Sequence, residues 1–198
     1  MGKKRAPHII CWDLEVLTPV TSWESARAGG SGCSCVVLSS SETGRLHLYT
    51  PAVKQQNGRL VADYLPLDEV VDHLNQADLL VGWNTTGFDT EVLENLLDRQ
   101  ISAPQYDILA AVWESLGHRE KGWKLGDVAL RTLGLDKNGS GASAPELAHR
   151  GEWGKLLDYC SNDVYLVQQL WNHIVDNRCL PAPDGGTVRL TPPYEDYA

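Results

Sequence analysis

Two acidic residues lie two positions apart, with one residue between them, in the apolar stretch His-Ile-Ile-Cys-Trp-Asp-Leu-Glu-Val at residues 8–16. The stretch predicts a buried strand, on which Asp13 and Glu15 point to the same face. Two carboxylates a few ångströms apart repel each other, and burying them costs several kcal/mol unless a positive charge lies between them. The pair therefore predicts a bound cation, whose other ligands are expected elsewhere in the chain.

Two further carboxylates lie where they could join this pair. Asp89 follows the apolar strand predicted at 78–83, and ligands of open α/β sheets bind at such strand ends. Asp163 lies four residues after Tyr159 in a long predicted helix, so these two side chains share one helix face. Taken singly, Asp89 could merely stabilise a helix N-terminus, and Tyr159 and Asp163 could merely share a surface hydrogen bond. The combination is more specific than its parts.

The chain carries Asp-x-Glu at 13–15, Asn-x-x-x-Phe-Asp at 84–89 and Tyr-x-x-x-Asp at 159–163, in that order. This order resembles the DEDD superfamily of 3′–5′ exonucleases, in its tyrosine subclass. The similarity spans roughly residues 8–176 and looks closest, over 122–130 and 156–164, to stand-alone relatives of the exonuclease of family-B DNA polymerases. The resemblance implies an RNase H-like fold, a mixed five-stranded α/β sheet flanked by helices. Val16 departs from the pattern, because members usually have Thr or Ser there to help hold the terminal nucleotide.

Four carboxylates without His or Cys form a hard-oxygen ligand set that suits Mg²⁺ or Mn²⁺ rather than Zn²⁺. The resemblance implies two ions, about 3.5–4 Å apart, that clamp the attacking and leaving oxygens at phosphorus. Asp13 is then expected to bridge both ions, Glu15 and Asp163 to hold the ion of the attacking water, and Asp89 to act on the second ion. Tyr159 is expected to position that water, because a phenol with a pKa of about 10 is a poor base at neutral pH.

The resemblance to the exonuclease superfamily also implies contacts with the substrate. Leu14 is expected to wedge near the terminal base, Phe88 to stack on a base, and Asn84 to bond the backbone. Phe88 could equally be a core anchor of its helix. Residues 119–137 hold five Lys or Arg against three acids, and Lys124 in this stretch could meet a phosphate, although such runs often form only a solvated surface.

Other polar residues are given no part in the chemistry. Asp107 beside a predicted strand end is interpreted as structural. The histidine subclass would need His at position 158, where Asp158 stands, so the histidines are assigned no role. Five cysteines without a zinc-ribbon spacing are interpreted as reduced, mostly buried thiols.

Strands are predicted at 8–16, 35–38 and 45–49 as an antiparallel meander, then at 78–83 and near 106. Helices are predicted at 66–76, 87–100, 108–117, 122–134, 145–149 and 152–177. The Thr-, Ser- and Gly-rich residues 17–33 predict a long flexible loop that could form a flap over the site. Residues 137–143 predict a Gly/Ser loop. Strands followed by alternating helices and strands indicate the α/β class.

A chain of 198 residues favours one domain, assigned here as an exonuclease domain over 1–178 and a Pro-rich tail over 179–198. The net charge of −9 argues against gripping duplex nucleic acid by charge alone. It does not argue against a nuclease, because carboxylates that bind metal count as negative. With neither a membrane-spanning run nor a signal peptide, the sequence predicts a cytoplasmic protein.

The favoured function is a metal-dependent 3′–5′ exonuclease that acts on the 3′ ends of single-stranded DNA. The same chemistry on RNA, as in RNase D-type ribonucleases, stays open because the sequence shows no contact to a 2′-hydroxyl. A catalytically inert nucleic-acid-binding module with the same fold is a third hypothesis, and a small-molecule hydrolase with a carboxylate pair is a fourth. The expected partner is a single-stranded 3′ end, DNA rather than RNA, and a polymerase or DNA-repair partner is not specified.

Overall fold

A mixed five-stranded sheet forms the centre of the computed structural model, which describes residues 5–57, 59–137 and 143–193. The strand order is β3-β2-β1-β6-β7. β2 pairs antiparallel with both β1 and β3, whereas β6 runs parallel to β1 and to β7. The strands are β1 (Ile9–Val16), β2 (Cys33–Ser40), β3 (Arg45–Tyr49), β6 (Leu79–Gly82) and β7 (Gln105–Asp107). The expected RNase H-like arrangement is confirmed, and β1 is its central strand.

The alternation of side chains along β1 divides the core in two. Ile9 and Cys11 belong to the cluster on the α7 side of the sheet, whereas Ile10, Trp12 and Leu14 belong to the cluster on the opposite side. Because residues i and i+2 of a strand share a face, the residues at 13 and 15 face the same side as Ile9 and Cys11. All five cysteines are free and four of them are buried, as the sequence predicts.

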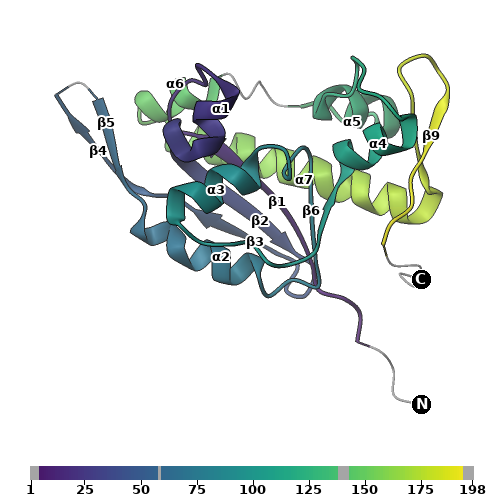
Figure 1. Cartoon of the computed structure of the whole chain (residues 1–198), viewed down its shortest axis with the longest axis horizontal. Coiled ribbons are helices and arrows are strands. Elements are labelled where there is room, and N and C mark those ends of the chain that lie inside the picture. Colours follow the sequence, from purple (N-terminus) through teal and green to yellow (C-terminus); the bar gives the residue numbers. More distant parts are fainter. Residues whose placement is uncertain (1–4, 58, 138–142, 194–198) are drawn as a thin grey trace.

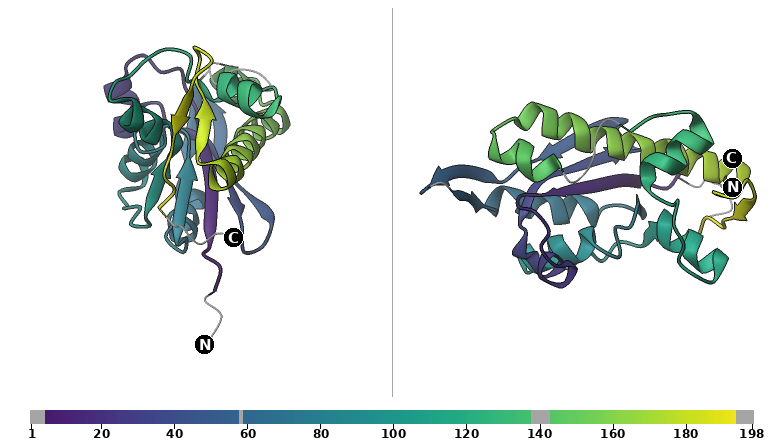
Figure 2. Two further views of the ribbon diagram at one scale, coloured as in Figure 1. Left: turned by 90° about the vertical axis from the view of Figure 1, so that its right-hand side faces the viewer. Right: turned by 90° about the horizontal axis from the view of Figure 1, so that it is seen from above.

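Helices cover both faces of the sheet (Figures 1 and 2). The first face carries α7 (Trp153–Asn177), whose buried residues include the predicted stripe at 156, 160, 164, 167, 171 and 174. The helices α4 (Ile108–Leu116), α5 (Leu125–Leu133) and α6 (Ala144–His149) contribute to the same core cluster. On the other face lie the 3₁₀ turn Leu65–Leu67, α2 (Asp68–Leu74) and α3 (Asp89–Leu97). Within the described part of the chain, no helix combines the length and the apolarity that crossing a bilayer requires.

Residues 17–33 are not the flexible loop that the sequence predicts. They contain the short helix α1 (Trp23–Ser25) and a π-helical turn, Ala26–Gly30. The Ser22 hydroxyl caps this segment by accepting the Ser25 N–H at 3.1 Å. Asn95 of α3 donates to the carbonyl of Arg27 at 3.1 Å, and the Arg27 guanidinium lies 3.6 Å from the Glu91 carboxylate. The segment is therefore docked on α3 by tertiary contacts, which a Ser/Gly-rich sequence does not reveal.

Two hairpins were not predicted. The first joins β4 (Ala52–Gln56) to β5 (Arg59–Asp63), and its strands are mostly exposed, so they lack an apolar pattern. The second joins β8 (Cys179–Pro181) to β9 (Thr187–Arg189) within the segment 179–198 that the sequence predicts to be a Pro-rich tail. Its residues Leu180 and Val188 are buried in the α7-side core. Residues 138–142 of the predicted Gly/Ser loop and 194–198 of the predicted tail lie outside the described residues.

Candidate metal centre

Three of the four predicted carboxylates meet where β1 ends beneath α7. Asp13 and Glu15 lie on the sheet face toward α7, and α7 carries Asp163 on its buried side. One carboxylate oxygen from each of the three lies within 4.8 Å of the others. The Cys160 thiol, one turn before Asp163, lies 3.6 Å from the Asp13 carbonyl oxygen, so strand and helix are in direct contact here. Residues far apart in the sequence are thus brought together as the motif pattern predicts.

Asp89 lies beside this group rather than within it. It is the first residue of α3 and is buried. Its Oδ1 accepts the backbone N–H of Leu14 at 3.2 Å, so it is bonded to β1 between the two acids of that strand. Burial raises the pKa of Asp89 well above its ordinary value, and the negative charge of Asp13 raises it further. Among the described residues, the group with mutual distances within 4.8 Å consists of Asp13, Glu15 and Asp163.

The clustered acids bind protons much more tightly than free carboxylates do. Loss of solvent, and then the charge of Asp163, raises the pKa of Asp13 to about 8. The pKa of Glu15 is also raised well above its usual value, by burial and then by the charge of Asp13. A group of acids that resists ionisation in this way lacks sufficient positive charge nearby. A divalent cation would supply that charge and replace the protons.

Lys137 is a cation of the chain itself that reaches this site. Its Nζ lies 2.6 Å from Oδ2 of Asp163 and 4.9 Å from the centroid of the Tyr159 ring. A Cβ at Gly126 would lie 3.0 Å from the Lys137 Cβ, so the glycine leaves room for the lysine stem. The charge of Lys137 lowers the pKa of Asp13, Glu15 and Asp163 and so opposes the larger effect of burial. In the sequence Lys137 stands out only as part of the basic stretch 119–137, because no local pattern shows where its stem leads.

Buried oxygen atoms at the site remain available to a ligand. Neither the Tyr159 hydroxyl nor Oδ1 of Asp163 has a hydrogen-bond partner of normal geometry among the described residues. Buried polar atoms are nearly always bonded, so such atoms call for a water molecule or an ion. The all-carboxylate donor set fits a hard divalent cation such as Mg²⁺ or Mn²⁺. Burial raises the pKa of Tyr159 above its ordinary value, and the charges of Glu15 and Asp163 raise it further, so the phenol stays protonated at neutral pH.

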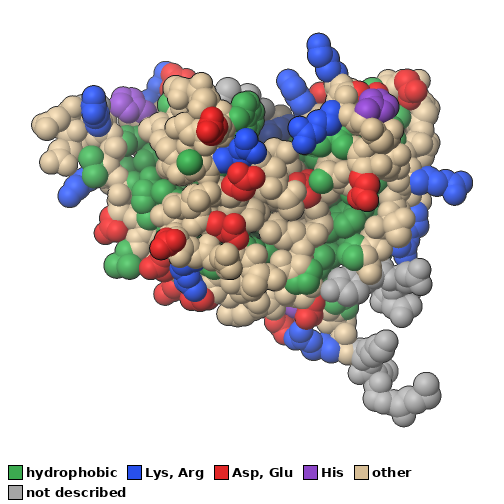
Figure 3. Space-filling view, viewed as in Figure 1, with side chains coloured by type: hydrophobic (Ala, Val, Ile, Leu, Met, Phe, Trp, Pro, Cys, Tyr) green, Lys and Arg blue, Asp and Glu red, His purple; other side chains and the backbone are tan. Residues whose placement is uncertain are grey.

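The residues predicted to bind substrate lie in different environments. Leu14 is only 5% exposed and packs in the core on the α3 side. Asn84 adopts a left-handed conformation with φ of 64° in the turn after β6, and Phe88 is half-buried at the start of α3. Lys124 is exposed at the N-terminus of α5. Figure 3 shows several Lys and Arg side chains near the upper edge of the molecule, over the part where α4 and α5 lie.

Asp107 is structural in this fold, as the sequence interpretation holds. It is the last residue of β7 and caps α4. Its carboxylate accepts hydrogen bonds at 2.8–3.2 Å from the N–H groups of Asn84, Thr86, Leu109 and Ala110 and from the Thr86 hydroxyl. These bonds fix the turn that follows β6 and thereby place α3 with Asp89 at its first position.

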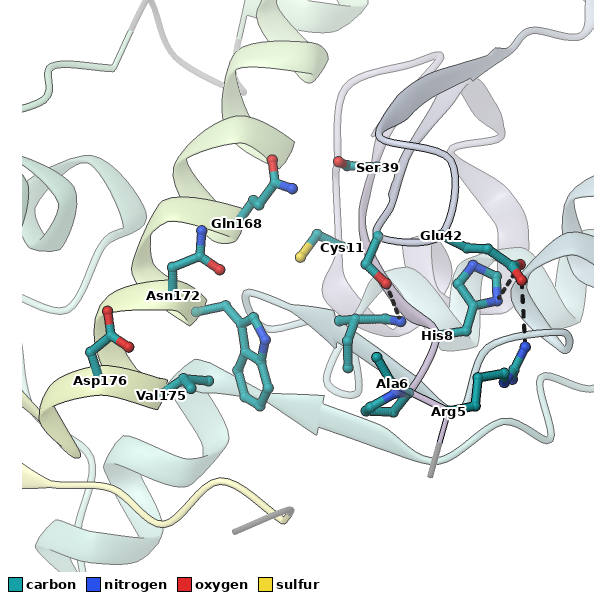
Figure 4. Close-up of a pocket in the computed structure, with 14 residues that line it drawn as sticks. Arg5, Ala6, His8, Cys11, Ser39, Glu42, Gln168, Asn172, Val175 and Asp176 are labelled. Atoms are coloured by element: carbon teal, nitrogen blue, oxygen red, sulfur yellow. Dashed lines mark hydrogen bonds and ion pairs between the residues drawn. The ribbon is translucent and has the colours of Figure 1, made fainter. Parts of the chain in front are cut away.

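A cavity of about 650 Å³ lies at the other end of β1 (Figure 4). Its lining comes from residues 5–9 and Cys11, from the end of β2 with the turn that follows, and from the second half of α7. It includes Cys11, Gln168 and Asn172, but none of the four predicted acids. The acidic cluster is therefore a separate feature, and the chemistry predicted from the sequence belongs to the opposite end of the central strand.

The raised pKa values predict how the stability of the metal-free protein depends on pH. A carboxyl whose pKa is higher in the folded state stabilises the fold below its unfolded pKa, and this stabilisation is lost as the pH rises through the folded pKa. For Asp13 the window runs from about 4 to about 8. In EDTA, the melting temperature should therefore fall over this window, and the fall should be smaller in Asp13→Asn. Identical pH profiles for the two proteins would contradict the prediction.

The fold and the acidic cluster define an RNase H-like α/β protein with a candidate metal centre at the end of its central strand. Among solved structures, the chain is similar to the family B DNA polymerase from the hyperthermophilic archaeon Pyrobaculum calidifontis, with a TM-score of 0.66 and 16% sequence identity. The match covers 88% of this chain and 25% of the polymerase, so the chain spans about a quarter of that protein's length. At this identity the likeness shows a shared fold. No protein-family model and no curated protein matches the sequence.

Proposed function

We propose that this protein is a metal-dependent 3′–5′ exonuclease that removes nucleotides from the 3′ ends of single-stranded DNA. The observation that carries the proposal is the meeting of Asp13, Glu15 and Asp163 within 4.8 Å at the end of β1. Burying acids together is unfavourable, and Lys137 supplies one positive charge beside three carboxylates, so their convergence is better explained by metal binding than by stability. The order of the acidic motifs and the fold shared with a family B DNA polymerase support the same reading.

Each acid has a distinct part in this mechanism. Asp13 would contact both ions, whereas Glu15 and Asp163 would hold the ion next to the attacking water. Asp89, bonded to the Leu14 N–H, would act on the second ion through water. When bound, a pair of divalent ions stabilises the charge on the attacking and leaving oxygens of a phosphodiester. Asn84, Phe88 and Lys124 would contact the strand, whereas the Leu14 side chain, which was expected to wedge near the terminal base, is buried in the core.

Tyr159 is assigned to orientation of the attacking water rather than to proton abstraction, because its pKa is raised above the ordinary value. Tyr159→Phe removes only the hydroxyl and should lower kcat by about 10- to 100-fold, the loss expected for one hydrogen bond to a charged group. The pH dependence of kcat should keep its shape. Steady-state kinetics between pH 6 and 9 would check this. Disappearance of one limb of the profile would instead make Tyr159 a proton-transfer group.

The deciding experiment follows the degradation of a 5′-labelled single strand in the presence of Mg²⁺ or Mn²⁺. Successive removal of 3′ nucleotides should yield a ladder of shortening labelled products, and Asp13→Asn should yield none. A matched RNA strand, run in parallel, separates the two substrate classes, because faster RNA degradation would make the protein an exoribonuclease. Binding of the strand without release of any nucleotide would make it an inert nucleic-acid-binding module. A single internal cut would rule out the exonuclease assignment.

A further inference from the structure

Trp23 is a large aromatic residue that remains 63% exposed although its segment is firmly docked. The segment is held by the Ser22 cap and by the contacts of Arg27 with α3. Gly29 reaches φ of 82°, and a Cβ there would lie 3.5 Å from the backbone nitrogen of Leu96, so the chain packs closely on α3. Single exposed apolar side chains are common on protein surfaces, so the exposure of this indole gains meaning only from its fixed support and from the residues beside it.

The position of Trp23 connects it to the acidic cluster. Its ring meets Phe88 edge to face, with the ring centroids 5.2 Å apart. Phe88 directly precedes Asp89, whose carboxylate is bonded to β1 at Leu14. Figures 1 and 2 show α1 beside α3, on the side of the sheet opposite α7. The rings of Trp23 and Phe88 therefore lie on the α3 side of the sheet, near the end of β1. Asp13 and Glu15 project from the same strand end toward the α7 side.

The chemistry around Trp23 favours a base over a phosphate. Glu24 and Arg27 bring one charge of each sign, and the Arg27 guanidinium is already paired with Glu91, so the segment offers no net positive charge to a nucleic-acid backbone. An indole face, in contrast, stacks on any unpaired base without regard to sequence. The edge-to-face contact with Phe88 leaves most of the Trp23 surface open to solvent for such stacking.

We propose that Trp23, supported by Phe88, is a base-stacking residue of the substrate site and receives an unpaired base close to the 3′ end of the strand. This inference rests on the proposed function, since it deepens the account of the same site. The recognised group is the aromatic face of a nucleobase, so the contact should tolerate any sequence. The contribution of Trp23 to the binding free energy should change little with ionic strength, unlike the contribution of phosphate contacts.

The test measures binding of a 5′-fluorescein-labelled 12-nucleotide thymidine strand by anisotropy, with the full chain in an Asp13→Asn background to prevent cleavage. Trp23→Ala should weaken binding by about 5- to 100-fold, the range found for loss of one stacked base. Trp23→Phe, which keeps an aromatic face, should weaken it less. Leu48→Ala, at another exposed large apolar residue on the edge strand β3, is the matched control and should leave the affinity unchanged. Melting temperatures of all variants would establish that they are folded.

Strands with a single abasic site at each of the last four positions complete the test. Removing the base that stacks on Trp23 should weaken binding in the background protein but have no further effect in Trp23→Ala, because both changes delete the same contact. If Trp23→Ala binds as tightly as the background protein, or if abasic effects are additive at every position, the inference is wrong. If the background protein binds no strand at all, and wild type releases no nucleotide, the proposed function itself fails.

Discussion

Replacing Asp13 with Asn should reduce nucleotide release by about 1000-fold or more, which corresponds to about 4 kcal/mol of transition-state stabilisation. The substitution keeps the shape of the side chain and removes the charge that is placed to contact both ions. The Asp13 carboxylate lies in one group with those of Glu15 and Asp163, with ligand atoms within 4.8 Å of one another. Initial rates of nucleotide release from a labelled strand at pH 8 in Mg²⁺ measure the effect.

The same substitution should make the metal-free protein more stable. Asn removes one of several acids that burial and mutual repulsion hold in an unfavourable state. Above about pH 8, where Asp13 ionises in the metal-free protein, the Asn side chain avoids the cost of a buried charge, and the melting temperature in EDTA should therefore rise by a few degrees. Asp176→Asn, at an exposed position of the same helix as Asp163, is the control. It should change neither the rate of nucleotide release nor the melting temperature. A less stable Asp13→Asn protein would show that the carboxylate is structural.

Divalent ions should stabilise the wild-type protein strongly. At a concentration of Mg²⁺ or Mn²⁺ about 100 times the dissociation constant, binding to the folded state alone contributes about 2.7 kcal/mol. For a chain of this size, that free energy corresponds to a rise in melting temperature of about 5–10 °C. Thermal unfolding followed by circular dichroism, with and without added ion, measures the shift. An excess of EDTA should return the curve to that of the metal-free protein.

The location of the ions is tested by the same measurement on two variants. Asp163→Asn removes a carboxylate of the cluster and should abolish most of the shift, whereas Asp176→Asn, on the same helix, should retain it. Equal shifts in the two variants would mean that the ions bind elsewhere. Because this readout requires no substrate, it separates the presence of a metal centre from the question of which strand the protein degrades.

The sequence alone predicts the helices and strands that are marked by a local pattern of apolar residues. The alternation of β1, the apolar β6 and the stripe of α7 each indicate an element and the face that it buries, and the structure places them as expected. Asp107 was correctly interpreted as structural, because an acid at a strand end that precedes a helix is a natural cap. The convergence of Asp13, Glu15 and Asp163 followed from the order of the motifs rather than from any single one.

Features that depend on contacts between distant residues were not predicted. The docking of residues 17–33 relies on side chains of α3, and a segment rich in Ser and Gly gives no sign of such support. Lys137 reaches Asp163 only because Gly126 leaves space for its stem, a relation that no local pattern encodes. The exposed β4–β5 hairpin lacks an apolar face, so the periodicity that identifies strands is missing there.

The contact between Cys160 and Asp13 joins residues that are 147 positions apart. During synthesis, the N-terminal acids therefore leave the ribosome long before the helix that completes their cluster. A nascent chain holds Asp13 and Glu15 without Asp163, and the ligand set is assembled only after nearly the whole domain has been translated. The three-acid group is thus complete only in molecules whose chain has been translated beyond Asp163.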